Sequence, residues 1–284
     1  MSSIYFTFRK PFVMLVAFLI MLREGIEAAL IVGIVAGFLK QSGHTHLMPK
    51  VWLGVILAVI LCLGLGLGIH RATGEIPQKQ QELVAGLIGL VAVAMLTYMI
   101  LWMKKAAKSM KHHLYDSVQA ALHQGNGQGW ALVGMAFLAV AREGLESVFF
   151  LLAVFQQSPT AAMPIGAVAG LGAAVVIAYL LYQGGIRLNL AKFFRWTGVF
   201  LILVAAGLLA GSLRALHEAG VWNHLQSIVF NSSAYLHEDS PLGVLLGGFF
   251  GYTDHPTQGE VLVWLLYLVP VMIWFWRDTR VGLK

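Results

Sequence analysis

Seven separate apolar runs, each long enough to cross a membrane, divide this chain. A helix needs about 20 apolar residues to span the hydrocarbon core of a bilayer. Runs of that length fall near residues 12–39, 50–70, 83–103, 130–157, 163–183, 196–216 and 261–276. The first run continues to Leu39 without a signal-peptide cleavage site, so we expect it to be a span. The pattern predicts an all-α, polytopic membrane protein with seven transmembrane helices.

The composition leaves little room for a soluble domain. Of 284 residues, 58% are hydrophobic and 11% are charged, whereas soluble domains carry about 25% charged residues. We therefore expect one membrane domain over residues 1–284. The net charge of +6 does not indicate nucleic-acid binding, because most basic residues flank the apolar runs. The single cysteine, Cys62, excludes an intrachain disulfide.

The basic residues predict how the chain is oriented. Of 19 Lys and Arg residues, 12 fall on one side of the expected spans, 5 on the other and 2 inside the spans. Basic residues favour the cytoplasmic side, so we expect the N-terminus outside and the C-terminus in the cytoplasm. Most carboxylates outside the spans fall on the outer side, where they could collect cations. Outer-mouth candidates for receiving a metal, each with a capping or interfacial role as its alternative, are Glu75, Glu82, His217 and Glu218.

Two copies of one charged motif interrupt the apolar runs. The first is R-E-G-I-E at residues 23–27, and the second is R-E-G-L-E at residues 142–146. Each copy lies near the middle of its run. An ionised side chain at that depth costs about 2.5–3.5 kcal/mol on insertion scales. Six such groups in one repeated pattern indicate a functional site.

The spacing of the motifs predicts an inverted repeat. The motifs lie in the first and fourth runs, so their helices should cross the membrane in opposite directions. This is typical of a 3+3 inverted repeat, with its site near the midplane between the halves. We expect repeat one over about 12–103, repeat two over about 130–216 and an additional C-terminal helix. Residues 217–260 should form an outer loop with a Gly-rich re-entrant segment near 241–252, and 104–124 a cytoplasmic surface helix.

Each motif contains more carboxylate than its arginine can neutralise. Glu24 and Glu27 lie one helical turn apart, and Arg23 reaches Glu27 at a spacing of four. The second motif repeats this arrangement with Arg142, Glu143 and Glu146. Four carboxylates facing one another in a low-dielectric site need a cation to remain ionised. Carboxylate oxygens suit hard cations and also bind iron. We therefore interpret the four glutamates as a metal site, with Arg23 and Arg142 as their partners.

The glycine inside each motif adds a packing expectation. Gly25 and Gly144 carry no side chain beside the acids, so we expect the two motif helices to approach each other closely there. The alternative interpretation of the whole pattern is two structural ion pairs that hold no ligand.

Several stretches besides the doubled motif resemble one known family. They are A-R-E-G-L-E-S-V-F-F-L-L-A at 141–153, G-G-I-R-L-N-L at 184–190, H-E-A-G-V-W-N-H at 217–224 and G-E-I-P-Q-K-Q-Q-E-L at 74–83. Together they resemble the oxidase-dependent iron permease family over roughly residues 12–276. The resemblance implies a transporter and not an enzyme, with iron as transported substrate and no cofactor. It implies iron binding by Glu24, Glu27, Glu143 and Glu146. It also implies a bacterial inner-membrane protein, whose outer N-terminus would be periplasmic and whose C-terminus would be cytoplasmic. A periplasmic EfeO-type protein and a haem peroxidase of EfeB type are the implied partners.

Other functions stay open from the residues alone. A transporter of another divalent metal, such as manganese, would use the same carboxylates. An intramembrane glutamate- or metal-dependent protease is opposed by the lack of an H-E-x-x-H sequence and of a histidine at midmembrane depth. Ferrous and ferric iron are equally compatible with four carboxylates.

Overall fold

Long helices make up most of the computed structural model, which describes residues 2–74, 77–106, 128–157, 162–183, 189–238 and 240–280. The helices in the first half are α1 (Ser2–Gln41), the short 3-10 helix η1 (Thr45–Leu47), α2 (Met48–Gly74) and α3 (Gln78–Ala106). The second half contains α5 (Gln128–Gln157), α6 (Ala162–Tyr182), α7 (Leu190–Glu218), α8 (Pro241–Phe250) and α9 (Gln258–Arg280). No strand occurs in these described ranges, which confirms the expected all-α class.

Each expected apolar run lies within a helix, and the main difference is at the start of the first. Helix α1 begins at Ser2, well before the expected start at residue 12. Pro11 suggested a start, but the fixed φ of proline is helical and its missing N–H removes a single backbone bond. The expected surface helix at 104–124 falls largely outside the described residues, as does Glu75.

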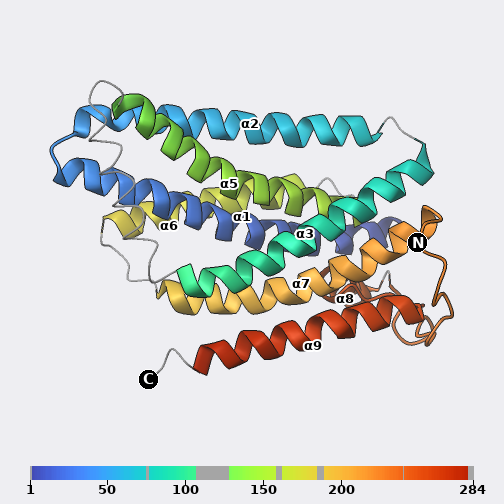
Figure 1. Cartoon of the computed structure of the whole chain (residues 1–284). Coiled ribbons are helices and arrows are strands. Elements are labelled where there is room, and N and C mark those ends of the chain that lie inside the picture. Colours follow the sequence, from blue (N-terminus) through green and yellow to red (C-terminus); the bar gives the residue numbers. More distant parts are fainter. Residues whose placement is uncertain are drawn as a thin grey trace.

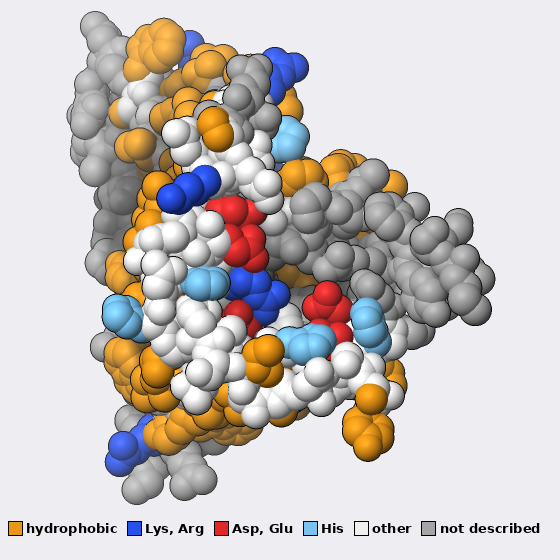
Figure 2. Space-filling view, turned by 90° about the vertical axis from the view of Figure 1, so that its right-hand side faces the viewer, with side chains coloured by type: hydrophobic (Ala, Val, Ile, Leu, Met, Phe, Trp, Pro, Cys, Tyr) orange, Lys and Arg blue, Asp and Glu red, His pale blue; other side chains and the backbone are white. Residues whose placement is uncertain are grey.

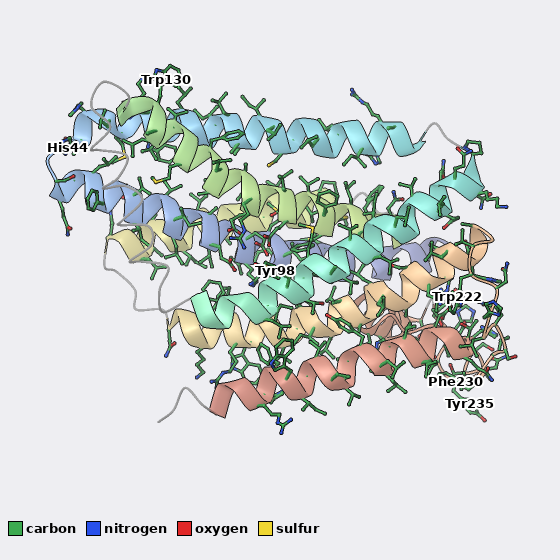
Figure 3. All side chains as sticks on the ribbon, in the orientation of Figure 1. His44, Tyr98, Trp130, Trp222, Phe230 and Tyr235 are labelled. Atoms are coloured by element: carbon green, nitrogen blue, oxygen red, sulfur yellow. The ribbon has the colours of Figure 1, made fainter. Side chains whose placement is uncertain are left out.

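Within the described residues, five helices are long and apolar enough to cross a membrane. They cover Thr45–Ala72, Gln78–Leu101, Ala162–Leu181, Lys192–Glu218 and Gln258–Arg277. Helices α1 and α5 have 40 and 30 residues, and each carries one charged motif in its middle. Indole rings mark both ends of the bundle, with Trp130 at one end and Trp222 at the other (Figure 3). Such rings are enriched where membrane proteins meet the polar headgroups.

The helices of the two halves interleave instead of forming two separate bundles (Figure 1). Helix α1 packs most extensively on α6, α2 on α5, and α3 on α7, while α9 lies against α7. Helices α1 and α5 also contact each other in the middle of the molecule. The N-terminus and the C-terminus lie at opposite ends of the bundle (Figure 1). Both motif helices therefore lie between helices of the other half.

The largest buried cluster lies where α1, α3, α5 and α7 meet. Its fully buried members include Ile20, Leu96, Phe150 and Leu201, and Phe275 of α9 packs into it as well. Small residues allow close approach elsewhere: a Cβ on Gly170 of α6 would lie 2.3 Å from the carbonyl oxygen of Phe18 on α1. This close packing fixes the position of α1 along its axis relative to α6.

Helix α8 and the chain around it form one end of the bundle. Ser240 caps α8 by accepting a hydrogen bond from the Gly243 N–H at 3.0 Å, and Gly251 ends it with a left-handed φ of 69°. The helix packs on α1 and α7. Nearby, Arg214 of α7 binds Glu260 of α9 through two hydrogen bonds of 3.0 and 2.8 Å. The Gly-rich segment is therefore helical, and an ion pair joins α7 to α9 beside it.

Candidate metal centre

Helices α1 and α5 bring the two charged motifs together inside the bundle. Glu24, Glu27 and Glu143 each offer a carboxylate oxygen, and these three oxygens lie within 4.8 Å of one another. All three residues are buried. Two carboxylates of the first motif and one of the second, more than 100 residues away in the sequence, thus form one compact group. It is the only group of three metal-ligating side chains found within the described part of the chain.

Arg23 is enclosed by the acids of its own motif. Its Nη1 donates to Glu24 Oε1 at 2.8 Å, and its Nη2 lies 3.0 Å from Glu27 Oε1. Arg23 Nη1 also donates a hydrogen bond to the sulfur of Met99 on α3. The centre of the Phe194 ring on α7 lies 5.8 Å from the guanidinium carbon. The expected pairing of Arg23 with Glu27 is confirmed, and Glu24 shares the same arginine.

The second motif is arranged differently around its arginine. Arg142 Nε donates to Glu146 Oε1 at 3.3 Å, which confirms the expected i,i+4 pair. Glu146 is buried but does not belong to the group of three carboxylates. Ser147, also buried, donates its hydroxyl to the Glu143 carbonyl at 3.0 Å. One motif therefore contributes two acids to the compact group and the other contributes one.

Three buried carboxylate oxygens at this centre lack a hydrogen-bond partner among the described residues. One of them, Glu27 Oε1, still lies 3.0 Å from Arg23 Nη2. Glu24 Oε2 and Glu146 Oε2 are buried and have no hydrogen-bond partner in the part of the chain that the structure describes. Two full negative charges 4.8 Å apart repel by roughly 3.5 kcal/mol at an effective dielectric constant of about 20. A buried donor set of this kind favours binding of a cation.

The motif glycines pack against other helices than we expected. A Cβ on Gly25 would lie 2.7 Å from the Cβ of Ala174 on α6, and one on Gly144 would lie 2.6 Å from Cys62 Sγ on α2. The expectation that these glycines bring α1 and α5 together was wrong in this respect. Each glycine lies on the opposite side of its helix from the acids. Gly25 therefore contacts α6 and Gly144 contacts α2, while the acids face the other motif.

Three of the outer-mouth candidates, Glu82, His217 and Glu218, do not join the buried group, and Glu75 lies outside the described residues. Glu82 is half-buried near the start of α3, and Glu218 is exposed at the end of α7. His217 Nδ1 lies 2.9 Å from the carbonyl oxygen of Trp222, so it bonds within the turn after α7. Acidic and histidine side chains gather at this end of the bundle (Figure 2).

Sequence reasoning missed the residues that cover Arg23 and the partner of Glu260. Met99 and Phe194 are ordinary apolar residues in the sequence, and no spacing links them to a motif on α1. Arg214 and Glu260 are 46 residues apart and lie in different helices. The polarity of Arg214 near the end of an apolar run was the only signal, and it did not identify a partner.

The comparison with known families decides the class of protein. Residues 14–281 match the Iron permease FTR1 family. The chain belongs to this iron permease family. A relative in Yersinia pestis, named "Ferrous iron permease EfeU", is 54% identical over 267 residues, covering 94% of this chain and 95% of the relative. A relative of the same name in Escherichia coli O157:H7 is 54% identical over 269 residues, covering 95% and 98%. No solved structure matches the chain.

Membership in this iron permease family agrees with the helical architecture. The relatives are named permeases, which are transporters and not enzymes. Several helices are long and apolar enough to span a bilayer, so the chain is a multi-pass membrane protein. The family resemblance expected from the doubled motif is confirmed, and the protease alternative is set aside.

Proposed function

We propose that this chain carries ferrous iron from the periplasm to the cytoplasm through a site made by the glutamates of both motifs. The observation that carries the proposal is the buried group of Glu24, Glu27 and Glu143, whose oxygens lie within 4.8 Å of one another. Its family and the name of its relatives supply the ion. Glu146, one turn after Glu143, is the fourth acid of the proposed site.

The charge balance of the motifs suits a divalent cation. Four glutamates and two arginines give a formal charge of −2 when all are ionised. A dipositive ion would neutralise this charge, and the unused oxygens of Glu24 and Glu146 would accept it as ligands. The apolar cluster around the centre keeps the dielectric constant low, which strengthens binding of the ion.

Seven spans in a 3+3 inverted repeat agree with the observed packing. A two-fold axis that exchanges α1–α3 with α5–α7 would place α1 on α5 and α6 on α2. The contact of α1 with α6 would then correspond to the contact of α5 with α2, and both contacts are extensive. Gly25 against α6 and Gly144 against α2 are equivalent in the same way. Helices α1 and α5 would then be spans despite their charges, and α9 would be the additional seventh helix. The site would lie on the axis, as in other inverted-repeat transporters.

The charge distribution supports the proposed direction of transport. The end with α8 carries acidic and histidine side chains that would attract iron (Figure 2). The loops at the opposite end of the spans are rich in Lys and Arg, which favours a cytoplasmic location. Iron would enter from the acidic end, bind the glutamates and leave toward the basic end. EfeO-type and EfeB-type proteins would act on iron before it reaches the outer end.

Uptake of iron-55 by cells that lack other iron importers tests the proposal. We expect Glu24→Gln and Glu143→Gln to reduce uptake at least tenfold, because each removes a ligand charge from the buried group. Asp278→Asn, which removes an acid outside both motifs and away from the acidic outer end, is the matched control and should retain near-normal uptake. Immunoblots of membranes establish equal amounts of protein.

Competition by other metals decides between iron and another divalent cation. An excess of unlabelled ferrous iron should suppress uptake of iron-55 more strongly than the same excess of manganese. Normal uptake by both glutamate variants at equal protein levels would reject the proposed site. Stronger suppression by manganese would reject the assigned substrate.

A further inference from the structure

The two motif arginines have equivalent places in the sequence and different surroundings in the structure. The Arg23 side chain is 2% exposed and lies 2.8 and 3.0 Å from Glu24 and Glu27. Met99 and Phe194 cover it from neighbouring helices. The Arg142 side chain is 43% exposed, and its Nε lies 3.3 Å from Glu146. Arg23 is enclosed, whereas much of the Arg142 side chain is exposed.

The exposed side of Arg142 identifies the hydrated side of the centre. Arg142 lies in the middle of α5, at the depth of the buried carboxylates. Charged side chains at this depth face other protein groups or water, because exposure to lipid is costly. A guanidinium that is partly exposed here therefore faces water or a polar passage. An arriving ion would meet Arg142 before it meets Arg23.

Glu146 is the acid that Arg142 holds apart from the group of three. Its Oε1 accepts the bond from Arg142 at 3.3 Å, which is longer than the 2.7–2.9 Å of strong charge-assisted bonds. Its Oε2 is buried and has no hydrogen-bond partner within the described ranges. One helical turn separates it from Glu143, which belongs to the group. A weak bond thus holds a buried carboxylate beside an incomplete metal site.

We propose that Arg142 is a displaceable counter-ion, which neutralises Glu146 in the empty site and moves away when the metal binds. Glu146 then becomes the fourth carboxylate ligand, while Arg23 keeps its bonds to Glu24 and Glu27. The inference rests on the proposed function and assigns unequal roles to the two arginines. Arg142 is a positioning residue for Glu146 and does not touch the ion.

The physical basis is competition between two cations for one carboxylate. A divalent ion carries twice the charge of a guanidinium, so it takes Glu146 when it arrives. Displacement costs little because Arg142 is already partly hydrated. The same competition lowers the affinity of the site and assists release, because Arg142 returns to Glu146 as the ion leaves. Arg23 is too enclosed to act in this way.

Binding of ferrous iron to the purified full chain, measured anaerobically in detergent, tests the inference. Arg142→Gln removes the cation that competes for Glu146, so we expect roughly two- to fivefold tighter binding of iron. The effect is small because a partly exposed ion pair contributes little free energy. Release into a chelator should slow by a similar factor. Arg142→Lys keeps the charge and should bind like the wild type. Arg71→Gln removes one exposed charge at the far end of α2 and should change nothing.

A double-mutant cycle separates competition from a structural role of Arg142. Glu146→Gln should weaken binding, and in that background Arg142→Gln should have no further effect on affinity. Suppose that Glu24→Gln abolishes iron binding, but that Arg142→Gln binds iron no more tightly than the wild type. This result would overturn the inference about Arg142 and leave the proposed site standing. Wild-type binding that is insensitive to Glu24→Gln would overturn the proposed site and this inference together.

Discussion

The thiol of Cys62 leaves almost no room beside the second motif. A Cβ on Gly144 would lie 2.6 Å from Cys62 Sγ and 3.4 Å from its Cβ. We expect Gly144→Ala to destabilise the protein by about 1–3 kcal/mol, as overpacking does in other cores. Cys62→Ala removes the sulfur and should restore stability in the double variant. Thermal unfolding in detergent measures both effects, and full stability of Gly144→Ala alone would contradict the close packing.

The enclosed arginine should be far less tolerant of change than its counterpart. Arg23→Gln leaves two buried carboxylates without their cation, and breaking a buried pair costs about 3–5 kcal/mol. Arg142→Gln should cost less than about 1 kcal/mol, because its pair is partly exposed. The amounts of folded protein recovered by size-exclusion chromatography compare the two variants. Equal losses would show that the two arginines are equally important for stability.

At the scale of helices, the ion pair of Arg214 and Glu260 holds α9 against α7. The two hydrogen bonds of 3.0 and 2.8 Å form a fork, and Glu260 lies in the first turn of α9, where a negative charge is favoured. Glu260→Gln should therefore lower the free energy of unfolding by about 1–3 kcal/mol. The exchange Arg214→Glu with Glu260→Arg should recover part of the loss. Thermal midpoints measure both, and an unchanged midpoint in Glu260→Gln would contradict the assigned role.

The loop between α7 and α9 depends on one carboxylate. Removal from water raises the pKa of Asp254, but bonds from His255 and the Glu238 N–H outweigh this and hold it below its usual value. A carboxyl with a lowered folded pKa stabilises the loop above about pH 4, and this contribution is lost as the pH falls through the folded pKa. Asp254→Asn should speed hydrogen exchange of residues 225–257 at pH 7. The difference from wild type should vanish as the pH falls through the lowered folded pKa of Asp254, and a difference that persists once this carboxyl is protonated would contradict this origin.

For the molecule as a whole, the number and direction of the spans can be tested by labelling single cysteines. In a Cys62→Ala background, Gln78→Cys and Asn231→Cys should react with an impermeant maleimide from the periplasmic side. Ser42→Cys and Gln183→Cys should react after permeabilisation alone. All but Gln78 lie in turns or loops, and all four are exposed. Reaction of Ser42 and Gln78 from the same side would reject α2 as a span.

Much of this architecture could be predicted from the sequence, because a membrane makes apolar length a direct signal. The seven runs became helices, and the i,i+4 pairs of both motifs formed as their spacing requires. The covering of Arg23 by Met99 and Phe194 could not be predicted, because it depends on how tilted helices meet. The unequal exposure of the two arginines has the same origin. Identical motifs contain no information about the different helices that pack around them.

The interleaved packing of α1 with α6 and α2 with α5 also constrains how the molecule is made. When the ribosome has completed α1 to α3, the packing partners of α1 and α2 have not yet been synthesised. Arg23, Glu24 and Glu27 then lie in a segment whose enclosing neighbours α5 and α7 are missing. We therefore expect the charges of the first motif to be fully covered only after α5, α6 and α7 have been synthesised. Neither half is a self-sufficient folding unit, although each carries a complete copy of the motif.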